Sequence, residues 1–154
     1  MTIIINAFTD GGCRPCNPGP GGYAVVFYKD NKLLDSISGG EILTTNNRME
    51  ITGVLKAIES IASFTWTHEY TTYNIYSDSS YVINGVNSWL ANWKRKGWIG
   101  SNKQTVKNLD LWQRVDALLT PELRSIINFR WVKGHSGIEG NEMADKLATE
   151  AIPK

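Results

Sequence analysis

Two aspartates stand where predicted strands end, and their positions suit them to chemistry. Asp10 closes the predicted strand Ile3–Asp10, and Asp78 closes the predicted strand Tyr73–Asp78. In open sheets built from strands and helices, ligands bind beyond the carboxyl ends of the strands. Aspartate also favours turns, so each residue taken alone is compatible with an ordinary turn. The pair is therefore a candidate ligand site, with the turn interpretation left open.

Three further residues add acid–base capacity, and each has a plain alternative. Glu50 lies three residues after Asn47, the spacing of a capping box at a helix start. Asp145 falls on the last predicted helix, where it also suits a solvated face. His135 lies between two glycines, which favours an exposed loop and proton transfer over a place in the core.

The two cysteines are Cys13 and Cys16, in the spacing Cys-x-x-Cys. A redox pair of this kind usually begins a helix, and the prolines around it disfavour a helix there. A zinc site needs about four ligands, and the sequence has no second cysteine pair. We interpret the cysteines as incidental thiols.

Charge is distributed unevenly along the 154 residues. The formal net charge is only +1, yet the segment 94–107 carries +5 and no acidic residue, which leaves −4 for the rest. This asymmetry predicts a basic patch beside a more acidic body.

No secretory signal is visible, and no apolar run approaches the ~20 residues of a membrane helix. We expect a cytoplasmic protein without a membrane partner.

Hydrophobic periodicity predicts an α/β fold with a mixed five-stranded sheet. The predicted strands are 3–10, 23–29, 33–38, 73–78 and 126–132. The predicted helices are 46–62, a short one from 79 that Gly85 interrupts or ends, 88–94, 108–119 and 142–151. Either Asn46 or Asn47 is expected to cap the first helix, and 11–22 is expected to be a loop. The first three strands predict an antiparallel meander, and the last two follow helices and predict parallel crossovers. The length suits a single domain, 1–154.

A series of motifs runs in order along nearly the whole chain: Thr9–Cys13, Asn17–Gly22, Thr44–Glu50, Ser77–Val82, Asn92–Trp98, Asn108–Trp112, Trp131–His135 and Asn141–Asp145. Together they resemble the type 1 ribonucleases H of bacteria. The resemblance implies a ribonuclease H-like fold and an endonuclease that hydrolyses the RNA strand of RNA–DNA hybrids. It also implies a free-standing, monomeric enzyme whose partner is the hybrid duplex.

The same resemblance implies a catalytic role for five residues. Asp10, Glu50, Asp78 and Asp145 match the four carboxylates that hold two Mg²⁺ ions, with Mn²⁺ as an alternative ion. His135 matches the loop histidine that aids proton transfer or product departure. The chemistry is consistent, because two metal ions activate water and stabilise the leaving oxygen without a protein nucleophile. Mg²⁺ prefers oxygen ligands, so carboxylates suffice.

The resemblance also implies substrate contacts, which fall into three groups. Asn17, Asn47, Ser80 and the backbone through Cys13 match RNA-strand contacts. Thr45 and Asn108 match positions that hold a phosphate of the DNA strand. A basic handle around 88–107 matches a second contact, through Trp93, Lys94, Arg95 and Lys96.

Two positions depart from the family pattern. Ser80 stands where members commonly carry a glutamine that contacts RNA, and Leu43 stands where an arginine often helps to hold a DNA phosphate. Both changes predict a lower affinity for the substrate, with the catalytic chemistry preserved.

Transposases, resolvases and proofreading exonucleases share the fold class but lack the handle and the Asn46–Glu50 block. A non-catalytic hybrid-binding module would have lost a carboxylate, and a reverse transcriptase domain is the remaining alternative.

Overall fold

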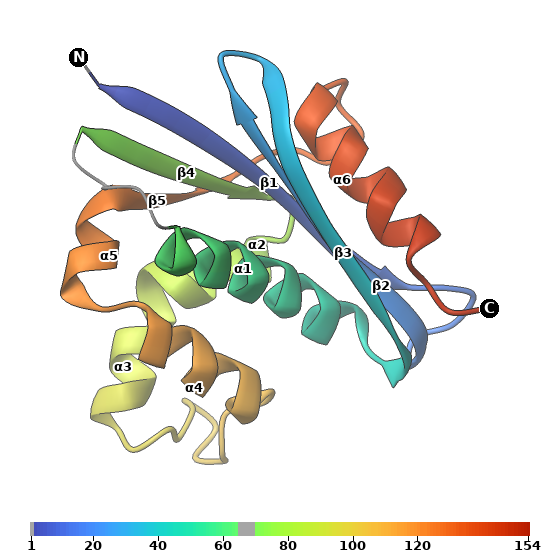
Figure 1. Ribbon diagram of the computed structural model, residues 1–154. Helices are drawn as coiled ribbons and strands as arrows, with labels where there is room; N and C mark the ends of the chain where they lie inside the picture. The colour runs from blue at the N-terminus through green and yellow to red at the C-terminus, as the bar shows by residue number, and fades with distance from the viewer. Residues whose placement is uncertain (1, 65–69) are drawn as a thin grey trace.

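A five-stranded mixed sheet forms the centre of the molecule in the computed structural model, which describes residues 2–64 and 70–154 (Figure 1). Its strands are β1 (Ile3–Cys13), β2 (Gly19–Lys29), β3 (Lys32–Thr44), β4 (Thr71–Ser77) and β5 (Ile127–Trp131). Their order across the sheet is β3-β2-β1-β4-β5. β2 pairs antiparallel with β1 and β3, whereas β4 pairs parallel with β1 and β5. The predicted meander and the parallel crossovers are confirmed.

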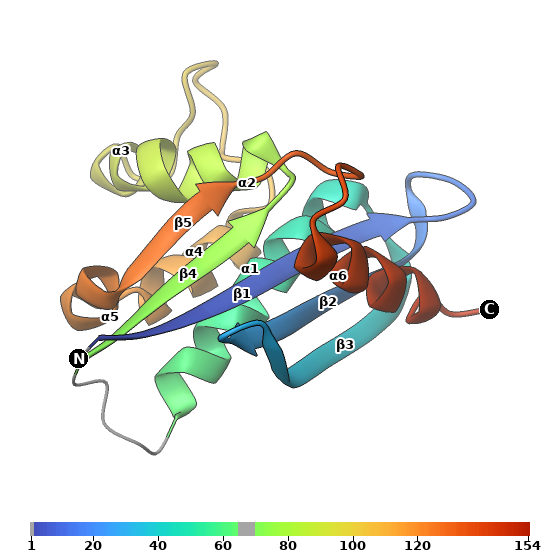
Figure 2. The same ribbon diagram turned by 90° about the horizontal axis from the view of Figure 1, so that it is seen from above.

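Helices cover both faces of this sheet (Figure 2). They are α1 (Asn46–Ser63), α2 (Ser80–Asn84), the π-helical turn η1 (Gly85–Trp89), α3 (Leu90–Arg95), α4 (Leu109–Leu118), α5 (Pro121–Ile126) and α6 (Glu139–Glu150). α1 packs on β1 and β2 from one side, and α4 packs against α1. α6 lies alone on the opposite face, over β1 and β2. None of the described helices is long and apolar enough to cross a membrane.

The strand β1 shows how the two layers share one sheet. Ile5 and Ala7 are buried in the main core beneath α1, while Phe8 points to the other face and packs with the smaller core under α6. This alternation is the period of two that a strand imposes. On the helix side, Val54 and Ile58 are fully buried against the sheet. Burial on both faces fixes the register of β1 and therefore the position of Asp10 near its end.

The predicted loop at 11–22 is wrong, because β1 and β2 continue through most of it. Gly12 pairs with Gly22, and Cys13 pairs with Gly21. The glycines allow close packing, since a Cβ on Gly22 would lie 2.2 Å from the carbonyl oxygen of Ala148 in α6. The strands β1, β2 and β3 are all longer than predicted, because glycine was taken as a turn signal where it serves close contact instead.

The helices differ from the prediction at the cap of α1 and at α5, and agree with it at Gly85. Thr45, and not Asn46 or Asn47, caps α1, and its Oγ1 accepts from the Arg48 N–H at 3.2 Å. Gly85 interrupts the helix, because α2 ends at Asn84 and the chain continues through the π-helical turn η1 into α3. A Cβ on Gly85 would lie 2.3 Å from the Trp112 ring. The short helix α5 was not predicted, although Thr120 caps it.

Candidate active site

Three carboxylates meet at the carboxyl ends of β1 and β4. Asp10 lies near the end of β1, Asp78 directly follows β4, and Glu50 lies in the first turns of α1. Each offers an oxygen atom, and these three atoms all lie within 4.8 Å of one another. The register explains the meeting of the two aspartates, because Phe8 pairs with Tyr76 in the parallel ladder, two residues before each of them. The predicted pair at the strand ends is therefore one site.

Close backbone packing brings Glu50 into this group. A Cβ on Gly11 would lie 2.3 Å from the carbonyl carbon of Met49, so only glycine lets the start of α1 approach β1 so closely. On the other side, a Cβ on Gly134 would lie 2.7 Å from the Asp78 carboxylate. The two glycines thus clear the space in which the carboxylates gather. A larger residue at either position would displace a carboxylate or the backbone that carries it.

Hydrogen bonds orient the carboxylates. The Gly11 N–H donates to Asp10 Oδ1 at 2.9 Å and to Glu50 Oε1 at 2.6 Å. The buried hydroxyl of Ser77 donates to Glu50 Oε2 at 3.4 Å, and the buried amide of Asn141 in α6 donates to Asp78 Oδ2 at 3.5 Å. Glu50 therefore faces the cluster and does not close a capping box. The contribution of Ser77 was not foreseen, and its position beside Asp78 was the available signal.

The cluster is electrostatically costly without a cation. Burial, followed by the charge of Asp78 among other causes, raises the pKa of Asp10 to about 7. Burial and the neighbouring carboxylates raise the pKa of Glu50 well above its usual range. Like charges forced together disfavour their ionised forms, and a bound cation reverses that effect. An all-oxygen donor set of this kind fits a hard divalent metal ion.

Asp145 lies beside this trio and outside its 4.8 Å limit. It extends from α6 and, together with Asp10, lines a cavity of about 170 Å³ that reaches Cys13 and Asn46. A hydrogen bond with Asp145 contributes to the raised pKa of Asp10. The fourth predicted carboxylate is therefore adjacent to the cluster, at the open side of the site.

His135 lies in the loop between β5 and α6. It is exposed and has a φ of 54°. Two hydrogen bonds hold the loop. Ser136 Oγ donates to the Lys133 carbonyl, and the Gly137 N–H donates to the Glu142 carboxylate. This places a solvent-reachable imidazole on the segment that follows Gly134, which itself contacts Asp78.

The predicted RNA contacts surround the start of α1. Asn17 Oδ1 accepts from the Asn46 N–H at 3.0 Å, and Asn46 Oδ1 accepts from the Cys13 N–H at 2.7 Å. Asn46 was missed as a functional residue, although it lies in the same motif as Asn47. Asn47 and Ser80 are exposed. The two cysteines are free thiols, as expected.

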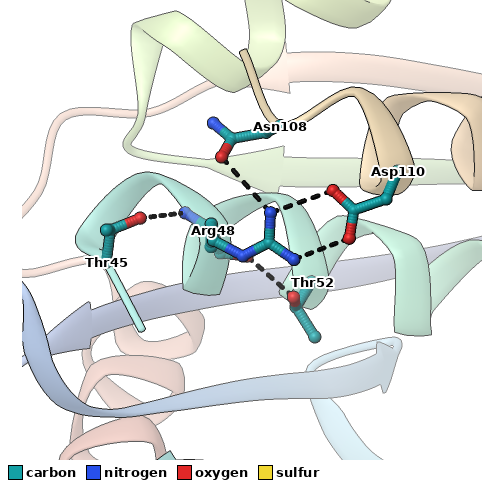
Figure 3. A network of polar contacts seen from close by, with 5 residues as sticks. All are labelled: Thr45, Arg48, Thr52, Asn108 and Asp110. Atoms are coloured by element: carbon teal, nitrogen blue, oxygen red, sulfur yellow. Dashed lines mark hydrogen bonds and ion pairs between the residues drawn. The ribbon is translucent and has the colours of Figure 1, made fainter. Parts of the chain in front are cut away.

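The predicted phosphate contacts lie on either side of Arg48 (Figure 3). Thr45 caps α1, and Asn108 takes the N-cap position of α4. Arg48 reaches across from α1 to Asn108 and forms an ion pair with Asp110 at 2.7 Å. The departure at Leu43 is exposed, with 75% of its surface accessible.

The basic handle has an aromatic base. Trp89 and Trp93 pack with ring centroids 5.9 Å apart, and Trp93 meets Trp112 at 5.4 Å. Trp98, like Trp93, is half-buried and packs against the main core.

The cations of the handle differ in their partners. Lys94 forms an ion pair with Asp116 at 3.2 Å, and Arg95 donates to Asn92. Lys96 is exposed and lines a surface hollow with Trp89 and Trp93. The handle therefore contains a paired lysine, an arginine bonded within α3, and Lys96, which borders a hollow together with the exposed Trp89 and the half-buried Trp93.

Comparison with known proteins identifies the family of the chain. The family model described as RNase H matches residues 3–153. Ribonuclease H of Ruthia magnifica subsp. Calyptogena magnifica is 46% identical over 152 residues, covering 99% of this chain and 96% of that protein. Ribonuclease H of Mycolicibacterium smegmatis is 44% identical over 150 residues, covering 97% and 87%.

Solved structures agree on the fold. The crystal structure of LC9-RNase H1, a type 1 RNase H, has a TM-score of 0.82 at 26% identity, covering 99% of this chain and 73% of that one. LC11-RNase H1 in complex with an RNA/DNA hybrid has a TM-score of 0.69 at 22% identity, covering 96% of each chain. At 22% identity, the similarity to LC11-RNase H1 shows a shared fold and nothing further.

Proposed function

Because this chain belongs to the ribonuclease H family, we propose that it hydrolyses the RNA strand of RNA–DNA hybrids at the carboxylate cluster. The observation that carries the proposal is the convergence of Asp10, Glu50 and Asp78 within 4.8 Å at the carboxyl ends of the strands. A relative of the same fold was solved with an RNA/DNA hybrid. Four carboxylates on a single chain make a second copy unnecessary, so we expect a monomer to be active.

Asp10, Glu50, Asp78 and Asp145 would hold Mg²⁺, which suits a site built from oxygen ligands alone. When bound, divalent ions activate the attacking water and stabilise the leaving oxygen of the phosphodiester. The raised pKa values of Asp10 and Glu50 support this assignment, because they arise from burial and from neighbouring carboxylates, and a cation would offset both effects. Mn²⁺ offers the same charge and accepts the same ligands.

The residues around the cluster keep it in one arrangement. The Gly11 N–H holds Asp10 and Glu50 side by side, and Asn141 holds Asp78 from α6. Ligands fixed in this way need no reorganisation when the substrate arrives. His135, exposed on its fastened loop, would move a proton or contact the product as it departs.

Selection of the RNA strand would occur beside α1. The 2′-hydroxyl is the group that separates RNA from DNA, and it is exposed in the wide minor groove of the hybrid. Asn46 ties the end of β1 to the start of α1, and Asn17 accepts from the Asn46 N–H, so the backbone near Cys13 lies beside the helix start that carries the exposed Asn47. Ser80 follows the third carboxylate with a side chain shorter than glutamine, which shortens its reach toward the RNA.

The handle would grip the DNA strand. Lys96, which borders the same hollow as Trp89 and Trp93, suits a phosphate backbone and carries no base-specific pattern. Trp93, Lys94 and Arg95 complete this surface from α3. Binding there is expected to be independent of sequence.

A cleavage assay tests the proposal. Labelled RNA–DNA hybrid, duplex RNA and duplex DNA are each incubated with the protein, with Mg²⁺ and with a chelator. We expect cleavage of the RNA strand in the hybrid alone, and only with the metal. Glu59→Gln, on the same helix as Glu50 but paired with Arg114, is the matched control and should retain activity. Cleavage of duplex DNA, or full activity of Glu50→Gln, would contradict the proposal.

A further inference from the structure

The Arg48 side chain joins the first turns of two helices (Figure 3). Its Nη1 donates to Asp110 Oδ1 at 3.0 Å, and its Nη2 donates to Asp110 Oδ2 at 2.7 Å. Nη1 also donates to Asn108 Oδ1 at 3.4 Å. These bonds raise the pKa of Arg48 and lower the pKa of Asp110. The Arg48 guanidinium thus forms a bidentate ion pair with the Asp110 carboxylate. Its Nη1 also donates to the amide oxygen of Asn108.

The amide of Asn108 is fixed from its other end as well. Its Nδ2 donates to the Tyr81 hydroxyl at 3.3 Å, and that hydroxyl also accepts from the Trp112 indole at 3.1 Å. The backbone of Asn108 is left-handed, with φ 61° and ψ 32°. The contacts assign the oxygen to Arg48 and the nitrogen to Tyr81. Within the described part of the chain, the second N–H of the amide is left to donate elsewhere.

We propose that Arg48 and Asp110 act as a positioning pair, which holds the Asn108 amide ready to donate to a phosphate of the DNA strand. This inference rests on the proposed function, because it requires that the hybrid binds beside Thr45 and Asn108. Arg48 acts through Asn108 and not as a cation for the phosphate, since the carboxylate of Asp110 already offsets its charge. Leu43 has no charge to offer the phosphate, so binding of the phosphate depends on oriented hydrogen-bond donors such as the Asn108 amide.

The alternative is that Arg48 attracts the phosphate directly by its charge, and the two roles predict opposite results for one substitution. Asp110→Asn removes a negative charge beside the substrate. If Arg48 acted by charge, this change would free the cation and tighten hybrid binding. If the pair positions Asn108, the same change loosens the guanidinium and weakens binding, despite the gain in net positive charge.

We expect Asp110→Asn to raise KM for the hybrid by roughly 5-fold, the loss of about one ordinary hydrogen bond, and to leave kcat within about twofold. Glu122→Gln is the matched control, since it neutralises an exposed acid in the first turn of the adjacent helix α5. Arg48→Lys keeps the charge but loses the planar fork, so it should raise KM as well. A lowered or unchanged KM for Asp110→Asn would overturn the proposal, as would a wild-type KM for Arg48→Lys.

A second readout uses the substrate. Hybrids that carry a single uncharged methylphosphonate at successive positions of the DNA strand locate the phosphate in question, as the position where neutralisation raises the wild-type KM. We expect Asp110→Asn to lose most of its KM effect on that hybrid alone. An equal KM effect at every position would show a merely structural role. Failure of the proposed function is distinct, because the wild-type protein would then cleave no hybrid.

Discussion

The acidic cluster and the basic handle are built in opposite ways. Asp10 and Glu50 are buried, with 8% and 7% of their surfaces exposed, and the backbone of β1 holds them together. Lys94 on the short helix α3 and Lys96 directly after it are exposed, and this helix stands away from the sheet (Figure 1). Buried like charges are costly, and they persist where a site needs them. Exposed cations cost little and act over a longer range.

Because of this difference, we expect changes in the cluster and changes in the handle to affect different kinetic parameters. Changes in the cluster should reduce the rate of the bound complex, since its residues serve the reacting phosphodiester. Changes in the handle should reduce affinity and leave that rate unchanged, because we propose that its cations contact only the backbone of the substrate.

The largest effect is expected from the carboxylates. Asp10→Asn, Asp78→Asn and Glu50→Gln should each reduce cleavage to near the background rate, because each removes charge from a metal ligand. Hybrid affinity should change little, and it is measured by fluorescence anisotropy in Ca²⁺. If Glu50→Gln retained full activity and lost only thermal stability, Glu50 would be a residue that stabilises the helix start.

His135→Ala should have an intermediate effect on the rate. Acid–base assistance is typically worth ~10²–10⁴-fold, and water partly replaces a missing imidazole. We therefore expect slower turnover under saturating hybrid, with a residual rate well above that of Asp78→Asn. Loss as complete as that of the carboxylate variant would assign His135 a more direct part in the reaction.

Replacing Lys94, Arg95 and Lys96 with alanine should weaken affinity and spare the rate. The slope of log affinity against log salt should fall by up to about one for each lost phosphate contact. Since Lys94 is already paired with Asp116, the total should be below three. The matched control replaces Lys29, Lys32 and Arg124, which lie on other elements. An unchanged salt slope for the handle variant would make the handle an ordinary solvated surface.

The metal-free protein should become less stable as pH rises from about 4 toward 8. The pKa of Asp10 is raised to about 7 from 3.8, so the folded state binds the proton more tightly than the unfolded state does. That contribution is full below the unfolded pKa and is lost as pH rises through the folded value. Asp10→Asn should therefore stabilise the metal-free protein at pH 8, by on the order of 2 kcal/mol. Thermal unfolding at pH 5 and pH 8 checks this, and a wild-type protein more stable at pH 8 than its variant would contradict it.

The smallest effect is expected from Ser80→Gln. A longer amide at the exposed start of α2 should reach the RNA strand and lower KM by a few-fold, the value of about one hydrogen bond. Steady-state kinetics on the hybrid decides it, with Ser88→Gln as a control on η1. An unchanged or higher KM would mean that another residue already fills this role.

Some of this molecule could be predicted from the sequence. The β-branched, buried character of 3–10 and the helical spacing of apolar residues in 46–62 predicted a strand and a helix there, and the positions of Asp10 and Asp78 predicted a site at the strand ends. Glycines misled the prediction at 11–22, because the value of a glycine such as Gly22 there is close packing against Ala148. Rules based on neighbouring residues treat glycine as a break in a helix or strand. They take no account of packing against a residue that is distant in the sequence.

The supporting residues of the site could not be predicted for a related reason. Ser77, Asn141 and Arg48 act on residues that are distant along the chain or on another element. Such pairs arise from the assembled fold and not from a local pattern. The cap of α1 shows the same limit on a small scale, since Thr45 and two asparagines were all suitable and the strand end at Thr44 decided the choice.

One measurement tests the separation of chemistry from grip most directly. Single-turnover cleavage of a labelled hybrid, followed at increasing protein concentration in Mg²⁺, gives the rate at saturation and the half-saturating concentration from one curve. We predict that Glu50→Gln abolishes the saturating rate, and that the alanine variant of Lys94, Arg95 and Lys96 shifts only the half-saturating concentration. A handle variant with a reduced saturating rate, or a Glu50→Gln variant that cleaves at the wild-type rate, would contradict the account.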